Sequence, residues 1–324
     1  MAFKYGMKAA VYPDQLQDRL ESFRRLGIPS VIELHLFGAD DVFSKDAAVW
    51  SSGVRRYADV CRFVVHYPIM DAKTGYLFDA SDDDCDRFEA VLDFTQACGA
   101  VGLVMHCCYG FNRDISKREA MTGFLAQVEH WNELSRMRGI RILLENYGFV
   151  WLPPGLGADY VTSPLDHCFP WDMAVMVAAI REKGMEAVGF LLDTAHAVLS
   201  ANMFNMRRRH GHLSGDKRFR NIFSEDLDRA RCLTASDFMH DSIEYFHVSD
   251  AFVWREEDNH LDEMRKWLYT ENLPIGRGNV DFAEIMEKAK GDETLIMEIN
   301  PEKGDHAHNI SQYEAVVWFR EKFG

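Results

Sequence analysis

The sequence lacks an apolar run that approaches the length of a membrane span, and its first residues, Met1-Ala-Phe-Lys-Tyr-Gly, contain no apolar core of a secretion signal. It also lacks a linker, a low-complexity tract and an evident domain boundary. Its seven cysteines, an odd and scattered number, are typical of reduced thiols rather than of a disulfide framework. We therefore expect one domain over residues 1–324 in a soluble, cytoplasmic protein without a membrane partner.

Positive charge is also scarce. The chain has 36 Lys and Arg against 51 Asp and Glu, a formal net charge of −15. Binding to polyanions requires clustered basic side chains that release counterions, so the charge balance disfavours nucleic acid as a partner. Hydrophobic residues make up 47% of the chain and aromatic residues 12%, which is ample for a core. The sequence leaves open a homo-oligomer.

Eight short, β-branched apolar runs are spread along the chain and predict strands. They lie near Lys8–Tyr12, Ser30–Leu36, Arg62–His66, Gly102–His106, Arg141–Glu145, Gly189–Asp193, Glu244–Val248 and Leu295–Ile299. Helical patterns lie between them, at Asp14–Leu26, Asp83–Cys98, Ser116–Met137, Trp171–Lys183, Ser224–His240, Phe282–Ala289 and Ile310–Phe323, with a weaker one around Asp40–Tyr57. Continuous apolar strands suit a parallel sheet covered on both faces. The eightfold alternation predicts an α/β fold, a single (β/α)8 TIM barrel.

Three long segments, Gly148–Pro170, Ala197–Arg220 and Ala251–Gly278, are predicted to be loops above the barrel mouth. The second carries two basic runs, Arg207-Arg-Arg-His-Gly-His212 and Lys217-Arg-Phe-Arg220. Arg208 and Arg209 are candidate contacts for an anionic substrate, a phosphate or carboxylate. A solvated loop that balances local acidity, or a contact with a DNA backbone, would use the same residues.

Six of the apolar runs end on a residue that can bind a metal: His66, His106, Glu145, Asp193, His247 and Glu298. In a barrel, the C-terminal ends of the strands converge on one mouth, where active sites lie. Three carboxylates and one imidazole, as in the last four of these residues, suit Mn²⁺, Mg²⁺, Co²⁺ or Zn²⁺. Glu33 alternates with apolar neighbours on the second strand, which favours an interior position as a substrate contact or as a satisfied buried group.

Four runs at these strand ends resemble one family. They are Leu144-Glu-Asn-Tyr-Gly148, Leu192-Asp-Thr-Ala-His-Ala197, Phe246-His-Val-Ser-Asp250 and Ile296-Met-Glu298. They are similar to the xylose isomerase-like barrel superfamily, which holds sugar and sugar phosphate isomerases and epimerases and the endonuclease IV type of abasic-site enzyme. The likeness covers nearly the whole chain in strand order. The Asp-Thr-x-His element, with a Glu one strand earlier, indicates the superfamily and not a member.

The resemblance implies one divalent-metal site made by Glu145, Asp193, His247 and Glu298. In the ketose epimerases of this group, the metal chelates the carbonyl and the adjacent hydroxyl of the sugar, and the two glutamates work on opposite faces of the carbon. Glu145 and Glu298 would then be catalytic residues as well as ligands. His196, and with it His66 and His106, would orient the substrate. The expected function is a metal-dependent isomerase or epimerase of a sugar or sugar phosphate, acting by proton abstraction beside the carbonyl.

Two alternatives stay open. In an endonuclease IV-like phosphodiesterase, His66, His106 and Glu145 would form a second metal site, and His196, Asp258 and His260 a third. The family's Gly-x-Gly turn after that Asp-x-His pair stands here at Ile275-Gly-Arg-Gly-Asn-Val-Asp-Phe282, displaced by an inserted Asp262–Pro274. The other alternative is a metal-dependent sugar lyase or dehydratase, which shares the proton abstraction and then expels a leaving group.

Overall fold

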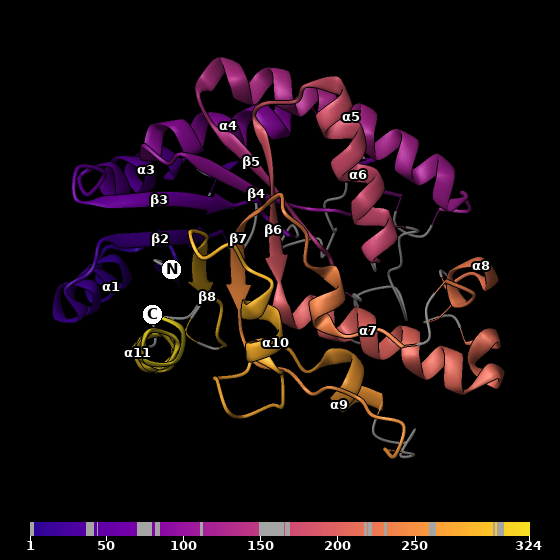
Figure 1. The fold of residues 1–324 in the computed structure, drawn as a ribbon. Coiled ribbons are helices and arrows are strands. Elements are labelled where there is room, and N and C mark those ends of the chain that lie inside the picture. The colour runs from indigo at the N-terminus through magenta and orange to yellow at the C-terminus, as the bar shows by residue number, and fades with distance from the viewer. Residues whose placement is uncertain are drawn as a thin grey trace.

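The chain forms a closed barrel of eight parallel strands in which each strand pairs with the next and β8 pairs with β1 (Figure 1). The computed structural model describes residues 3–36, 42–43, 45–69, 80–81, 85–110, 113–148, 165, 169–216, 219, 222–229, 232–258, 264–300, 302 and 308–324. The strands are β1 Lys4–Ala9, β2 Ser30–His35, β3 Cys61–His66, β4 Gly102–His106, β5 Arg141–Glu145, β6 Val188–Asp193, β7 Ile243–Val248 and β8 Thr294–Met297. The predicted (β/α)8 fold is confirmed.

Helices cover the outside of this barrel (Figure 1). They are α1 Pro13–Leu26, α3 Ala47–Arg55, α4 Cys85–Cys98, α5 Lys117–Arg138, α6 Pro170–Lys183, α7 Thr194–Arg209, α8 Ser224–Leu227, α9 Met264–Tyr269, α10 Phe282–Glu287 and α11 Ile310–Phe323, with 3₁₀ turns η1 Gly211–Gly215 and η3 Ala235–Phe238. The weak pattern around Asp40–Tyr57 contains α3. Where α1, α5 and α6 end, Gly27, Gly139 and Gly184 take the left-handed conformation that closes a helix.

Two predicted segments differ from the structure. Ala197–Arg220 is not a loop, because α7 runs through Arg209. Its residues from Thr194 to Phe204 are buried on all sides, so the sequence carries no one-sided apolar stripe. Ser224–His240 is not one helix. Asp226 accepts a hydrogen bond from the Phe223 N–H and Asp237 one from the Thr234 N–H, so that two short turns are capped separately.

The first strand is also displaced from its predicted place. It covers Lys4–Ala9, whereas Ala10–Tyr12 lead into α1, which Pro13 opens. In β1, Tyr5, Met7 and Ala9 alternate with Lys4, Gly6 and Lys8. An alternating strand of this kind is less apolar than the run that follows it. The predicted strand therefore began four residues too late, at Lys8 instead of Lys4. The consequence is that Lys8 lies near the C-terminal end of β1 and not at its beginning.

The barrel interior contains two sets of side chains. The apolar set consists of Val31, Val64, Val104, Leu143, Leu191, Tyr245 and Ile296, all buried against one another. Two residues after each of these positions, and two after Gly6 in β1, lies an ionisable residue on the same face, the last of them directly after β8. This ionisable set, one residue per strand, is Lys8, Glu33, His66, His106, Glu145, Asp193, His247 and Glu298. The fold therefore assembles eight ionisable side chains above an apolar floor.

Within the described ranges, none of the helices combines the length and the apolarity needed to cross a bilayer. Five cysteines whose side chains are described form no disulfide: Cys61, Cys98, Cys107, Cys108 and Cys232. Burial raises the pKa of Cys61 and of Cys98 to about 12, which keeps both thiols protonated and unreactive at neutral pH.

Candidate metal centre

Four members of the ionisable set offer ligand atoms that all lie within 4.8 Å of one another: Glu145, Asp193, His247 and Glu298. His247 stands between the three carboxylates. Its Nδ1 lies 2.7 Å from Glu298 Oε2, 3.0 Å from Glu145 Oε1 and 3.7 Å from Asp193 Oδ2. Burial lowers the pKa of His247, but the charges of Glu33, Glu298 and Glu145 outweigh it, so the pKa is raised well above its ordinary value.

Asp193 and Thr194 of the Asp-Thr-x-His element have separate structural roles. Asp193 ends β6 and caps α7, since its Oδ1 accepts a hydrogen bond of 2.8 Å from the His196 N–H. The Thr194 hydroxyl donates to the Ser249 carbonyl at 3.0 Å, which joins the ends of β6 and β7. The Asn146 side chain accepts from the Asp193 N–H at 2.6 Å and donates to its carbonyl at 3.0 Å. These bonds fix the direction in which Asp193 presents its other oxygen.

That other oxygen supports a bound cation. Asp193 Oδ2 is buried and has no hydrogen-bond partner among the described residues. A buried carboxylate oxygen without a partner is costly, and a metal ion would satisfy it. The donor set of three carboxylates and one imidazole nitrogen is also one that Mn²⁺, Co²⁺, Zn²⁺ and Mg²⁺ accept. The residues therefore fit the divalent ion that the sequence predicts.

Glu145 also faces a second group of ligand-type side chains. While its Oε1 contacts His247, its Oε2 lies 3.2 Å from His66 Nε2 and 3.3 Å from His106 Nε2. His66 Nδ1 lies 2.8 Å from the Tyr67 carbonyl, which can only accept, so Nδ1 carries the hydrogen and Nε2 faces the carboxylate. Burial raises the pKa of Glu145, but the neighbouring His247 and His106 outweigh this desolvation and hold that pKa well below its usual range.

His196 lies on the mouth side of Glu145. Its Nδ1 is 2.9 Å from the Asn146 carbonyl and 3.4 Å from Glu145 Oε1, and its Nε2 is 3.4 Å from Glu271 Oε2. Burial opposes the charged ring, but Asp193, Glu271 and Glu145 raise the pKa of His196 to about 10. The His106 ring lies 5.9 Å from that of His196, so both predicted substrate contacts border the same site.

Glu271 is a site residue that the sequence did not reveal. Its side chain is 34% exposed, and it comes from the inserted Asp262–Pro274 segment. The next residue, Asn272, has a φ of 57°, an unusual value for a residue other than glycine. The Asn300 N–H donates to the Asn272 carbonyl at 2.8 Å, and Leu273 pairs with Asp250. The backbone therefore holds this carboxylate at the site.

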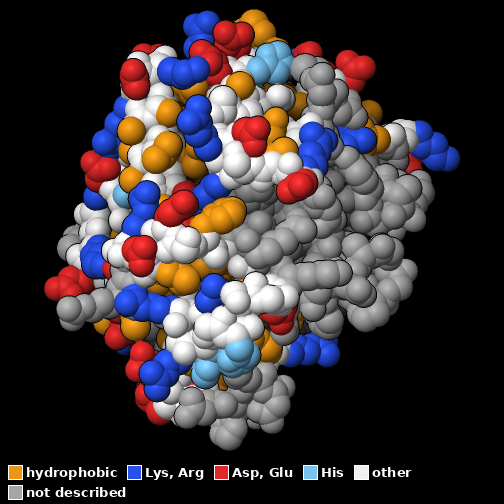
Figure 2. All heavy atoms as spheres, turned by 90° about the vertical axis from the view of Figure 1, so that its right-hand side faces the viewer, with side chains coloured by type: hydrophobic (Ala, Val, Ile, Leu, Met, Phe, Trp, Pro, Cys, Tyr) orange, Lys and Arg blue, Asp and Glu red, His pale blue; other side chains and the backbone are white. Residues whose placement is uncertain are grey.

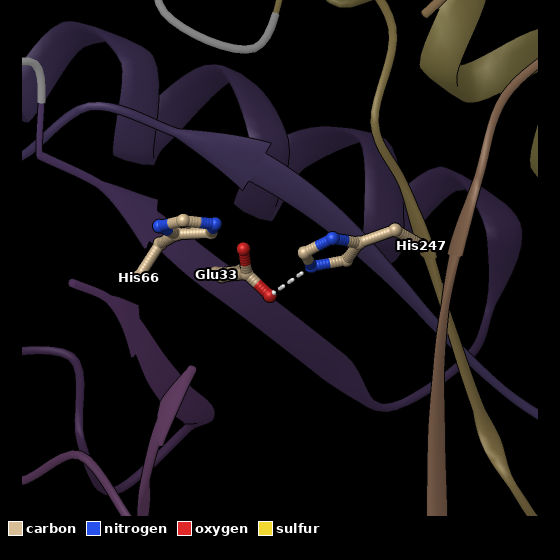
Figure 3. A group of neighbouring side chains, drawn as sticks. All are labelled: Glu33, His66 and His247. Atoms are coloured by element: carbon tan, nitrogen blue, oxygen red, sulfur yellow. Dashed lines mark hydrogen bonds and ion pairs between the residues drawn. The ribbon is translucent and has the colours of Figure 1, made fainter. Parts of the chain in front are cut away.

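Lys8 and Glu33 complete the buried ionisable set. Lys8 Nζ lies 2.9 Å from Glu33 Oε1 and 2.6 Å from Glu298 Oε2. Figure 3 shows the Glu33 carboxylate between the rings of His66 and His247, with a bond to His247 Nε2 of 2.8 Å. Burial lowers the pKa of Lys8, but Glu298, Glu33 and Glu145 outweigh it and raise that pKa, so the side chain is an ammonium ion. Glu33 was predicted to be either a substrate contact or a satisfied buried group, and the structure places it with no exposure to solvent.

Other predicted site residues are not brought to this centre. Arg208 and Arg209 are exposed at the far end of α7, roughly 20 Å along the helix from Asp193. The Asp258 carboxylate accepts a hydrogen bond from the Arg255 N–H at 3.0 Å in a local turn. His260 lies outside the described residues, as do Lys217, Arg218 and Arg220 of the second basic run.

The displaced Gly-x-Gly turn has a structural role of its own. The buried Asp250 carboxylate accepts hydrogen bonds of 2.9 Å from the N–H groups of Gly276 and Gly278, and one of 3.1 Å from that of Val280. A Cβ at position 278 would collide with the Ala251 carbonyl, so this close approach requires glycine. The turn is thus anchored to the end of β7.

Comparison with known proteins agrees with this geometry. A family model described as a xylose isomerase-like TIM barrel matches residues 77–321. The chain belongs to this family. No curated protein sequence matches the chain.

Solved structures show how broad the xylose isomerase-like fold is. A D-tagatose 3-epimerase-like protein is 18% identical, with a TM-score of 0.56 over 99% of this chain and 98% of that one. A family 2 AP endonuclease from Brucella melitensis is 12% identical, with a TM-score of 0.52 over 99% and 98% of the two chains. The IOLI protein, solved with a bound zinc atom, is 13% identical, with a TM-score of 0.53 over 98% and 96%. At these identities, the likeness concerns the fold.

Proposed function

We propose that this chain is a divalent-metal-dependent isomerase or epimerase that acts on a ketose-type sugar. The observation that carries the proposal is the four-ligand group, in which Glu145 and Glu298 both contact His247 Nδ1 and Asp193 Oδ2 is left without a partner. The xylose isomerase-like family and the epimerase-like solved structure support a sugar substrate. The zinc-bound solved structure supports a metal ion as cofactor.

The proposed roles follow from where the side chains lie. A divalent ion held by the four ligands would supply the positive charge that makes the C–H beside a sugar carbonyl acidic. One of the two glutamates would take that proton at a carboxylate oxygen, and the other would return one. Return to the same carbon from the other side gives epimerisation, and return to the neighbouring carbon gives isomerisation. His66, His106 and His196 would donate or accept hydrogen bonds with substrate hydroxyls.

The test combines metal analysis with solvent exchange. The protein, purified without added metal or chelator and then loaded with Mn²⁺, would be incubated in D₂O with a panel of ketoses and ketose phosphates. About one metal per chain and deuterium beside the carbonyl of an epimerised or isomerised product would support the proposal. Deuterium together with loss of water from the sugar would instead indicate a dehydratase. Metal-loaded protein that exchanges no proton with any ketose would refute the proposal.

A phosphodiesterase of the endonuclease IV type is the second candidate, because the group His66, His106 and Glu145 could hold a second ion. The charge distribution favours the sugar enzyme. The chain carries a net charge of −15, and acidic and basic side chains alternate over the described part of the face in Figure 2. The engagement of Asp258 in a local turn also leaves the third metal site without a described ligand pair. Two or three metals per chain and cleavage of abasic-site DNA would favour this candidate.

We expect Glu271→Gln to raise KM for the sugar that the panel identifies. Glu271 faces His196, and glutamine would replace a charge-assisted contact by a weaker neutral one, a change large enough to raise KM roughly tenfold. Metal affinity should not change, because Glu271 is outside the four-ligand group. Steady-state kinetics would check this, with Glu257→Gln, an exposed carboxylate of the same connection, as the control. An unchanged KM would remove Glu271 from the substrate site.

A further inference from the structure

We propose that Glu33 and Lys8 are positioning residues that fix the ring of His247 so that its Nδ1 faces the metal. The inference rests on the metal centre of the proposed function. It gives this buried pair a role in metal affinity, in place of the substrate contact that was one of the two roles considered for Glu33.

The first step is the direction of the hydrogen bond at His247 Nε2. Glu33 Oε2 lies 2.8 Å from this nitrogen, and both side chains are fully buried (Figure 3). An ionised carboxylate can only accept, so Nε2 donates. The nitrogen left for the metal is Nδ1, the atom that faces Glu145, Asp193 and Glu298. A carboxylate on the far nitrogen of a metal-binding histidine fixes both the tautomer and the ring orientation.

The second step is what holds Glu33. Lys8 and Glu33 are direct neighbours in the register of β1 and β2, and Lys8 Nζ lies 2.9 Å from Glu33 Oε1. Each Glu33 oxygen thus has its own partner, the ammonium ion on one side and the imidazole on the other. Lys8 Nζ also lies 2.6 Å from Glu298 Oε2, so one cation joins the orienting carboxylate to a metal ligand.

The third step is charge. Glu33 adds a fourth carboxylate to the three of the ligand group, and all four are buried. The two positive charges of a divalent ion do not neutralise four carboxylates. The Lys8 ammonium reduces the negative charge that is left. Buried charges are tolerated when they are paired, and removal of one partner is strongly unfavourable. The pair Lys8–Glu33 therefore supplies an orienting carboxylate without adding net charge to the site.

The same geometry argues against a metal in the group drawn in Figure 3. Glu33, His66 and His247 offer ligand atoms within 4.8 Å of one another. One oxygen of Glu33 is, however, paired with the Lys8 ammonium and the other with His247 Nε2. A cation entering between them would meet the positive charge of Lys8. Glu33 thus supports the metal centre from outside the ligand group.

The decisive variant is Glu33→Gln, measured by calorimetric titration of the metal-free protein with Mn²⁺ and with Co²⁺, without substrate. Glutamine can still accept a hydrogen bond but lacks the negative charge, and mutation of an orienting partner of a metal ligand is expected to weaken metal affinity roughly 10- to 100-fold. The control is Glu293→Gln, a buried carboxylate at the start of β8 that accepts from the N–H groups of Lys290 and Gly291. It should leave metal affinity unchanged.

A neutral replacement of both partners keeps the test informative if Glu33→Gln, which takes one of the two carboxylates from Lys8, prevents folding. The variant Lys8→Met, Glu33→Gln removes both charges at similar volume, and it should fold and also bind metal weakly. Parental affinity in either folded variant would overturn the inference. If the parental protein itself bound neither ion, the proposed metal centre would fail, whereas tight parental binding with an unchanged variant would refute only the role of this pair.

Discussion

Deuterium exchange at the substrate carbon is expected to fall roughly 10²- to 10⁴-fold in Glu298→Gln, the range that one general acid or base contributes to catalysis. Glu298 contacts His247 Nδ1 at 2.7 Å and Lys8 Nζ at 2.6 Å, so its carboxylate is fixed beside the ligand group. Glutamine has nearly the same shape and cannot exchange a proton as a carboxylate does. The measurement is the rate of deuterium incorporation from D₂O into the sugar that the wild-type protein converts.

The control for this experiment is a buried carboxylate outside the barrel interior. Glu302 accepts hydrogen bonds of 2.8 Å and 2.9 Å from the N–H groups of Ser311 and Gln312 at the start of α11. Glu302→Gln should retain the parental exchange rate. Metal content is measured on both variants, so that loss of the ion is separated from loss of the acid–base group. Exchange at the parental rate in metal-loaded Glu298→Gln would show that Glu298 is not the acid–base residue.

Metal-dependent stabilisation is expected to be largely lost in Asp193→Asn. A ligand present at a thousand times its dissociation constant stabilises a folded protein by about 4 kcal/mol, which for a chain of this size corresponds to a rise in Tm on the order of 10 °C. Wild-type protein should show this rise with Mn²⁺ and lose it with chelator. Asp193 Oδ2 is a buried oxygen of the ligand group without a hydrogen-bond partner among the described residues, and asparagine removes the charge of this side chain.

The substitution is selective because the two oxygens of Asp193 have different roles. Its Oδ1 caps α7 by accepting from the His196 N–H, and asparagine caps helices about as well as aspartate. The Tm of the metal-free variant should therefore stay close to that of the metal-free wild type. Thermal unfolding with and without Mn²⁺, for both proteins, checks this. An equal rise in Tm for the two proteins would remove Asp193 from the metal centre.

The sequence contained enough information to predict most of the ionisable set. His66, His106, Glu145, Asp193, His247 and Glu298 follow apolar runs that are read as strands without ambiguity. In a barrel, the position of a residue at a strand end determines where its side chain meets the others. The places of these six residues could therefore be predicted from local patterns, even though they lie far apart in the chain, and the resemblance to the family selected the four ligands among them.

Lys8 and Glu271 could not be predicted, for two different reasons. Lys8 lies in a strand whose alternating polar and apolar residues are typical of an exposed edge strand. The more apolar Ala10–Val11 beside it led us to place the strand too far along the chain. Glu271 depends on how the connection after β7 folds back, with Asn272 at positive φ and Leu273 paired with Asp250. Such long-range backbone contacts leave no periodic signal in the sequence.

The basic run of α7 shows the limit of assigning function from a predicted loop. Arg208 and Arg209 were expected over the mouth because Ala197–Arg220 was interpreted as a long loop after the sixth strand. An amphipathic helix would have shown a one-sided apolar stripe, which this segment lacks. A helix buried on all sides lacks that stripe as well. Since a helix advances about 1.5 Å per residue, its far end carries these arginines away from the site.

The spacing of two residues between the apolar set and the ionisable set restricts where this chain can tolerate insertions and deletions. Side chains alternate between the two faces of a strand, so one residue added or removed between Leu143 and Glu145 would turn that carboxylate out of the barrel. The same holds for every other strand. Length can therefore vary only in the connections between strands, where the Asp262–Pro274 insertion has added a carboxylate without disturbing the ligands.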